Sequence, residues 1–205
     1  AGAIGIATSL TIGAGTTLDV SASNFAINIA GNWTTNGTFN PRNGTVTFDG
    51  TTGTQTIAGT TTFFDLTLNN AGATTNFGSS STTISHNLVT TAGTMDGGTS
   101  TIIFTGNPGA ISGASAKNFN NLVINAGANV SNSTGGNTTI GNDYTNNGTY
   151  TQAAGLTTTF SVGDGTHSLL GNGTTTFGVV SIVAATTVDA GSHSFNVVGA
   201  SFDVA

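Results

Sequence analysis

Apolar residues along this chain occur in short groups in which every second position is apolar. Val46 and Phe48, or Leu66 and Leu68, are separated by single polar residues, which is the pattern of a strand with one buried side. Clusters of Gly, Asn and Asp interrupt these groups about every nine residues and are typical of turns. No stretch has the periodicity of a helix, so the sequence predicts an all-β protein.

The pattern recurs with a 56-residue period. Phe48, Phe104 and Phe160 follow one another at this interval, and Leu66 and Leu122 keep the same spacing. Such a period indicates a repeat architecture, in which each unit buries its apolar side on its neighbours. We predict one array of about three and a half copies over residues 1–205: a partial repeat at 1–26, repeats at about 27–82, 83–138 and 139–194, and a partial repeat at 195–205.

Two architectures fit six short strands in each 56-residue unit. In a parallel β-helix (β-solenoid), each strand stacks on its counterpart in the next coil, and six strands make two or three coils. In the alternative, antiparallel β-sandwich or jelly-roll modules follow one another, which the spacing of the turns also suggests. A separate 56-residue sandwich would be small for a core of its own, so the sequence favours the solenoid.

Charge is scarce and mostly negative. Charged residues make up 5 % of the chain, against roughly 25 % in ordinary soluble domains, and the two cations are Arg42 and Lys117. Two cations cannot neutralise a phosphate backbone or hold the chain to an anionic membrane, which excludes nucleic acid as a partner. No apolar run approaches the roughly 20 residues that cross a bilayer. The absence of cysteine excludes disulfides and thiolate metal sites.

Carboxylate chemistry has little support. Glycosidic hydrolysis needs two carboxyl groups within roughly 5–10 Å, but only Asp19 and Asp189 have matching contexts in the repeat. The other aspartates considered fall in different phases: Asp49, Asp65, Asp96, Asp164 and Asp203. The histidines have unlike contexts and are expected in solvated turns: His86, His167 and His193. We predict that the chain is not an enzyme and has no cofactor, with calcium as one alternative.

The calcium alternative depends on two Asp-Gly turns. Asp49 and Asp164 each precede a glycine in a turn rich in carbonyl groups, which is the oxygen environment that calcium prefers. Neither sequence matches an EF-hand loop or the glycine-rich repeat of calcium-binding β-rolls. Asp-Gly is also a good tight turn, and the sequence favours that interpretation.

Several surface roles fit the polar residues. Glycan attachment is possible at eight Asn-x-Thr/Ser sites, although Asn-Gly-Thr also forms turns: Asn32, Asn36, Asn43, Asn129, Asn132, Asn137, Asn147 and Asn172. Carbohydrate contact is possible through Trp33, Tyr144 and Tyr150. However, Trp33 recurs as Leu88 or Val89 and as Tyr144, which favours a packing position. The threonine runs 60–62, 157–159 and 174–176 could form hydroxyl ladders of the kind that ice-binding solenoids use.

Both ends of the sequence read as uncapped strands. Apolar residues alternate near each end with almost no charge to prevent edge pairing: Ile4, Ile6, Leu10, Ile12, Phe195, Val197 and Phe202. The chain is therefore expected either to be a piece of a longer array or to pair head-to-tail with copies of itself.

The recurring pattern "GNW…NGTF…GTVTF.G…QTI.G…F..LTLNNAGA" resembles repeats of very large secreted or cell-surface β-solenoid proteins of bacteria and archaea. The resemblance covers nearly the whole chain. It implies an extracellular structural or adhesive role, as a filament, sheath or surface-layer segment, or as an adhesin stalk. It carries over no catalytic residues.

Overall fold

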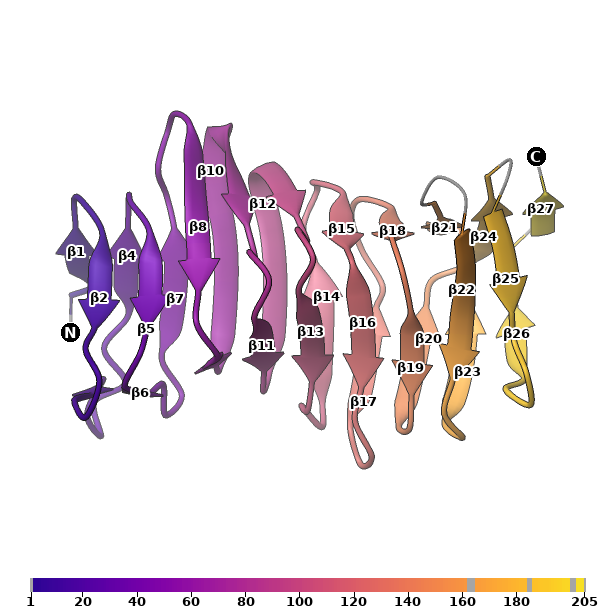
Figure 1. Cartoon of the computed structure of the whole chain (residues 1–205), viewed down its shortest axis with the longest axis horizontal. Helices are drawn as coiled ribbons and strands as arrows, with labels where there is room; N and C mark the ends of the chain where they lie inside the picture. Colours follow the sequence, from indigo (N-terminus) through magenta and orange to yellow (C-terminus); the bar gives the residue numbers. More distant parts are fainter. Residues whose placement is uncertain (1, 162–164, 184–185, 200–201, 205) are drawn as a thin grey trace.

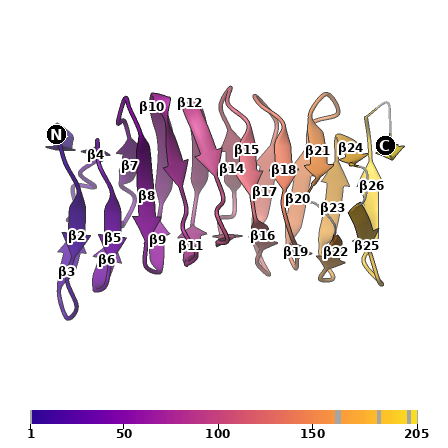
Figure 2. The same cartoon turned by 45° about the horizontal axis from the view of Figure 1, so that its top comes forward.

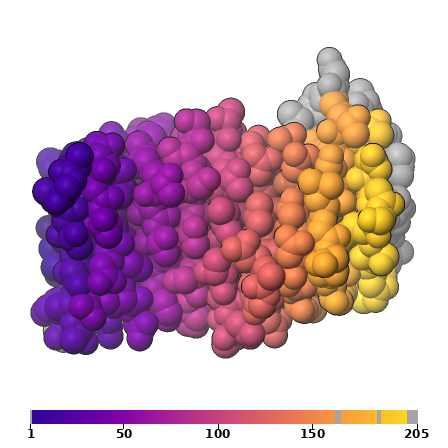
Figure 3. Space-filling model, turned by 60° about the horizontal axis from the view of Figure 1, so that its bottom comes forward, coloured from indigo at the N-terminus to yellow at the C-terminus, as the bar shows by residue number. Residues whose placement is uncertain are grey.

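The computed structural model describes residues 2–161, 165–183, 186–199 and 202–204, and this part of the chain is a parallel β-solenoid (Figure 1). It contains strands and turns without helices, and its strands pair in parallel. The predicted solenoid is confirmed, and the antiparallel alternative is wrong. Successive coils follow the long axis of a rod, and the first and last strands lie at opposite ends of it (Figures 2 and 3).

The strands form three faces. The first face consists of β1 (Ile4–Ile6), β4 (Ile27–Ile29), β7 (Thr45–Phe48), the start of β10 (Asp65–Asn76), the start of β12 (Asn87–Asp96), β14 (Gly109–Ser112), β17 (Asn129–Asn132), β20 (Thr149–Gln152), β23 (Thr174–Phe177) and β26 (Phe195–Val197). The second face consists of β2 (Leu10–Ile12), β5 (Trp33–Thr35), β8 (Thr54–Ala58), the ends of β10 and β12, β15 (Lys117–Phe119), β18 (Thr138–Ile140), β21 (Thr157–Phe160), β24 (Val179–Ile182) and β27 (Phe202–Val204). The third face consists of β3 (Thr17–Asp19), β6 (Thr38–Asn40), β9 (Thr61–Phe63), β11 (Ser81–Ile84), β13 (Thr101–Phe104), β16 (Asn121–Ile124), β19 (Tyr144–Asn146), β22 (Gly165–Leu170) and β25 (Thr186–Asp189).

The sequence repeat and the coil have different lengths. Ile27 and Phe195 begin β4 and β26, which lie eight steps apart on the first face, so the 168-residue interval between them makes eight coils with a 21-residue mean length. One 56-residue repeat therefore spans two and two-thirds coils, or eight strand positions rather than the six that we predicted. Consequently Phe48 lies on the first face, Phe104 on the third and Phe160 on the second. Equivalent residues of successive repeats therefore lie on different faces, one face apart.

The core consists of inward-facing side chains that stack in register between coils. On the first face, Ile27 pairs with Val46, which pairs with Leu66, which in turn pairs with Leu88, and all four are at most 1 % exposed. Each coil thus buries its apolar side on its neighbours, as repeat proteins require.

Polar side chains at the corners connect consecutive coils. In eight places among the described residues, a side-chain oxygen accepts the backbone N–H of a residue one coil later. These pairs are Ser9 with Asn32, Asn32 with Thr56, Asn24 with Asn43, Asp65 with Asn87, Asn121 with Asp143, Asn137 with Thr157, Asp143 with Ser168 and Gln152 with Gly178. These bonds satisfy backbone donors that the strand ladders leave unpaired, which gives much of the asparagine in the turns a structural role.

Candidate functional site

The aromatic residues considered for carbohydrate contact lie inside the solenoid. Trp33, Tyr144 and Tyr150 are each at most 1 % exposed. Trp33 packs edge-to-face on Phe39 and Phe63, with ring centroids 4.7 and 5.2 Å apart. The packing interpretation of this recurring position is confirmed. The alternative of sugar contacts through these three rings is wrong, because no ligand reaches them.

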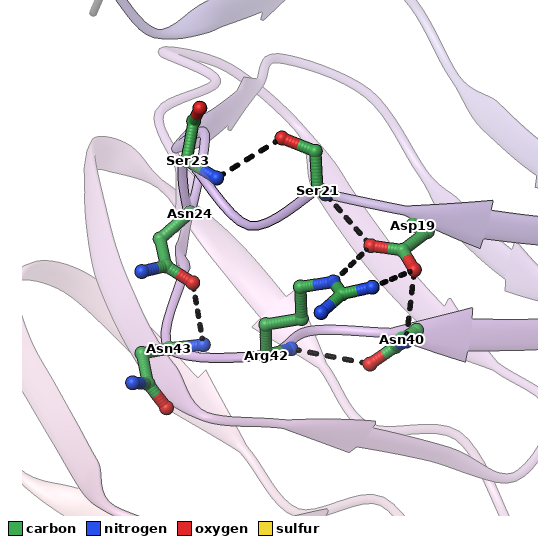
Figure 4. A network of polar contacts seen from close by, with 7 residues as sticks. All are labelled: Asp19, Ser21, Ser23, Asn24, Asn40, Arg42 and Asn43. Atoms are coloured by element: carbon green, nitrogen blue, oxygen red, sulfur yellow. Dashed lines mark hydrogen bonds and ion pairs between the residues drawn. The ribbon is translucent and has the colours of Figure 1, made fainter.

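The polar network in Figure 4 joins two successive turns between the third and first faces. Arg42 donates from Nε and Nη2 to the two carboxylate oxygens of Asp19, at 2.5 and 2.8 Å. Asn40 Nδ2 and the backbone N–H of Ser21 donate to the same carboxylate at 2.9 and 2.7 Å. Four N–H donors thus surround one carboxylate.

The chemistry of this network fits a structural link between two consecutive coils. Hydrogen bonds from Arg42 lower the pKa of Asp19, and Asp19 raises the pKa of Arg42. Ser21, Asn24 and Arg42 adopt left-handed backbone conformations, with φ of 61°, 53° and 45°, and these shape the two facing turns. Because its oxygens already accept four N–H groups, Asp19 is poorly placed to act as a metal ligand or a general base.

The remaining carboxylates and histidines are dispersed. Within the described ranges, no three His, Asp or Glu side chains lie close enough to hold a metal ion. Asp49 is half-buried, whereas Asp164 and the side chain of Asp203 lie outside the described residues. His86 Nδ1 lies 2.8 Å from Asp65 Oδ1, and the ring of His86 stacks on Phe64 with centroids 4.6 Å apart.

The other two histidines are buried, so the expectation of solvated turns is wrong for them. His167 and His193 are 1 % and 7 % exposed. His193 Nε2 lies 3.0 Å from Thr175 Oγ1, and its Nδ1 lies 3.0 Å from the carbonyl oxygen of Gly171. A hydroxyl beside an oriented imidazole is also the arrangement of an activated nucleophile.

The surroundings of Thr175 and His193 disfavour nucleophilic chemistry. Asn146 Nδ2 donates to Thr175 Oγ1 at 2.7 Å, and the hydroxyl of Tyr144 lies 3.0 Å from the same oxygen. If Thr175 donates to His193, both of its lone pairs are occupied, and its side chain is buried. Burial also raises the pKa of Tyr144 well above its ordinary value. The network therefore fits a role in joining coils.

A buried polar seam runs along the interior corner between the first and second faces. Here an amide side chain at the end of the first face bonds a threonine that begins the second. The pairs are Asn70 with Thr75, Asn132 with Thr138 and Gln152 with Thr158, at 2.8–3.0 Å. Gln55 extends the seam by accepting from Gly50 N and donating to the carbonyls of Ile29 and Gly31.

Lys117 belongs to this seam, although lysine is almost never fully buried unless its charge is paired. Its side chain is fully buried, and Nζ donates to the carbonyls of Gly113 and Gly136 at 2.6 and 3.1 Å. Burial lowers its pKa to about 8. The only sequence signal is its place at the start of a strand, where the following coils have Thr138 and Thr158.

Seven of the eight glycosylation candidates are exposed. Asn132 is fully buried and its amide donates to Thr138 and to Tyr150, so of the eight possible sites this one is closed to a glycan. The exposed candidates lie at corners or strand starts: Asn32, Asn36, Asn43, Asn129, Asn137, Asn147 and Asn172.

The threonine runs do not share a face. They belong to β9 on the third face, β21 on the second and β23 on the first. In each run one threonine points inward, namely Thr61, Thr158 and Thr175, and all three are buried. A continuous hydroxyl ladder from these runs is therefore excluded.

The predicted assembly residues differ in accessibility. Within the described part of the chain, β1–β3 and β25–β27 each pair on one edge only. Ile4 is 46 % exposed, Ile6, Leu10, Phe195 and Val197 are partly buried, and Ile12 is buried. The side chain of Phe202 lies outside the described residues.

Shallow hollows mark the outer surface. One of about 440 Å³ lies against Asn172 and Asn196, and one of about 350 Å³ lies against Asn28 and Asp49. A third, of about 230 Å³, lies where β12, β15 and β18 follow one another.

Comparison of the chain with protein families, characterised proteins and solved structures finds no match. The described residues include no helix of the length and apolarity that crosses a membrane.

Proposed function

We propose that this protein is a non-catalytic structural rod of the cell exterior, a subunit or segment of a surface filament, sheath or surface layer. The observation that carries this proposal is the contrast between recurring inward positions and varying outward ones. Phe48, Phe104 and Phe160 recur at 56-residue intervals, and all are at most 1 % exposed.

The side chains at equivalent outward positions of these repeats differ in chemistry. Asp65, Asn121 and Val179 begin equivalent strands and carry a carboxylate, an amide and an aliphatic group. A repeat that served one ligand many times would keep its outer residues. A repeat that retains only its core and corners favours length and stiffness as the function. The carboxylate of Asp19 accepts four N–H groups, and the buried hydroxyl of Thr175 lies within hydrogen-bond distance of three side chains; both arrangements agree with a non-catalytic role.

Assembly occurs head-to-tail through the strand edges of the end coils. Among the described residues, β1–β3 and β25–β27 each have a neighbouring strand on one edge only, and edge strands pair readily with further strands. The partner is a second copy of this chain or further coils of a longer one. Because the two end surfaces differ, the contact is heterologous and builds open filaments. An exterior location follows from the resemblance to surface repeats.

The test is the assembly state of the purified 205-residue chain. Sedimentation velocity and negative-stain micrographs are expected to show concentration-dependent filaments. Lysines in place of Ile4 and Ile6 should block them, because charges at an edge oppose pairing. Thr151→Lys, on the exposed outer side of β20, is the matched control and should leave the filaments intact. A monodisperse monomer over the whole concentration range would contradict assembly by copies of the chain.

The non-catalytic part has a separate test. The folded chain is expected to leave neutral and acidic polysaccharides uncleaved over long incubations. Cleavage that disappears in a single Asp→Asn variant would refute this part of the proposal.

A further inference from the structure

A row of polar side chains follows the outer side of the second face. Thr56 pairs with Asn76, which pairs with Asp96, and farther along the rod Asn118 pairs with Thr139. The third face differs, because Ile103 and Val123 stand at consecutive outward positions there.

The hollow of about 230 Å³ interrupts this row between Asp96 and Asn118. Its lining includes three glycines, Gly97, Gly98 and Gly141, and the buried Phe119. Stacking of the coils requires two of these glycines. A Cβ on Gly97 would come within 2.5 Å of the backbone N of Asn120, and a Cβ on Gly98 within 2.3 Å of the carbonyl of Gly78.

The rim of the hollow combines a fixed carboxylate with uncommitted polar groups. Asn76 Nδ2 donates to Asp96 Oδ2 at 2.5 Å and Gly98 N donates to Oδ1 at 2.9 Å, so two bonds orient the carboxylate and leave lone pairs outward. The side chains of Asn118 and Thr139 make no hydrogen bond to other described residues. Donors and acceptors thus lie beside glycines that a ligand can approach closely.

We propose that this hollow binds one neutral hexose unit. A sugar hydroxyl both donates and accepts, which matches an adjacent carboxylate, amide and hydroxyl. The net charge of −6 and the lack of an accessible unpaired cation among the described residues disfavour anionic ligands. The volume is below the roughly 300 Å³ at which drug-sized sites begin, which suits one ring. Because the one aromatic residue among the described residues that line the hollow is the buried Phe119, the affinity is low, with a Kd on the order of 1 mM. This inference is independent of whether the rods join end to end.

The test is a ¹H–¹⁵N NMR titration with glucose, galactose, mannose and N-acetylglucosamine, each up to high millimolar concentration. With at least one sugar, the amide signals of Gly97, Gly98 and Gly141 are expected to shift together and to saturate. Asp96→Ala and Asn118→Ala should each raise Kd at least fivefold, because each removes a direct partner. The spectra also report whether each variant is folded.

Matched controls and polymers separate the alternatives. Asp49→Ala, at the hollow near Asn28, should leave the affinity unchanged. Dextran, mannan and galactan test whether the unit is bound within a polysaccharide; binding of free hexose alone would make the ligand a free sugar. Absence of saturable shifts for every sugar, or shifts that persist in folded Asp96→Ala and Asn118→Ala, would overturn the proposal.

Discussion

Replacement of Lys117 by methionine is expected to change how the stability of the rod depends on pH. The lysine side chain is fully buried, and its ammonium group bonds two carbonyl oxygens without a carboxylate partner among the described residues. Burial lowers its pKa from 10.5 to about 8. Methionine has a similar length and carries no charge, so Lys117→Met removes the titration and keeps most of the volume.

The direction in which stability changes with pH follows from proton binding to Lys117. Between pH 8 and 10.5 the unfolded chain holds a proton on this lysine that the folded chain has lost, so the free energy of unfolding rises with pH in this window. A shift of this size corresponds to about 3 kcal/mol in total, and about 2 kcal/mol of it accrues between pH 7 and 9.5. The variant lacks this rise.

The measurement is urea unfolding at several pH values from 7 to 9.5, followed by the fluorescence of Trp33, the only tryptophan and a fully buried one. The upper limit keeps the tyrosines of the unfolded chain mostly protonated. We expect the free energy of unfolding of the wild type to rise by about 2 kcal/mol relative to Lys117→Met. A constant difference between the two proteins over this range would refute the reasoning.

Three further predictions concern other parts of the rod. Gly135→Ala should cost at least about 3 kcal/mol, because φ is +102° and a Cβ would lie 1.8 Å from a backbone oxygen; Gly127→Ala, with φ of +81° and open space, should cost about 1–2 kcal/mol in the same urea assay. Gln55→Leu leaves a buried N–H and a carbonyl unpaired and should cost about 2–5 kcal/mol by thermal or urea unfolding; a cost below about 1 kcal/mol would contradict the seam's role. Burial raises the pKa of Tyr150 to about 12, so the free energy of unfolding should fall by about 2 kcal/mol as pH rises from 10 to 12; Tyr150→Phe should lessen this fall, and ultraviolet absorbance follows the ionisation.

Much of the fold could be predicted from the sequence, because alternation and turn residues act locally. The buried slots of Trp33 and Tyr144 followed from their exchange with aliphatic residues in the repeat. The number of coils could not be predicted, because a 56-residue period shows which positions are alike but does not give the number of corners in each repeat. Only the pairing of Ile27 with Val46, and the pairs that follow it along the first face, show that coil and repeat differ.

The polar interior was less accessible to sequence reasoning. Lysine and asparagine are mostly exposed in proteins and histidine is intermediate, and the burial of Lys117, Asn132 and His193 depends on partners many residues away. The hollow beside Asp96 likewise arises from glycines in two different coils. Its signal in the sequence was only the Asp-Gly pair, which also forms ordinary turns.

The central claim is a rod built from coils with a 21-residue mean length, and a single distance tests it directly. Asn28 and Asn196 occupy the middle of β4 and β26 and face outward on the first face. The chain has no cysteine, so Asn28→Cys and Asn196→Cys accept two spin labels selectively. Eight coils at about 4.8 Å per coil predict a separation of about 38 Å by pulsed electron paramagnetic resonance. Two coils per repeat would give about 29 Å and three about 43 Å at the same spacing, and either result would contradict the account.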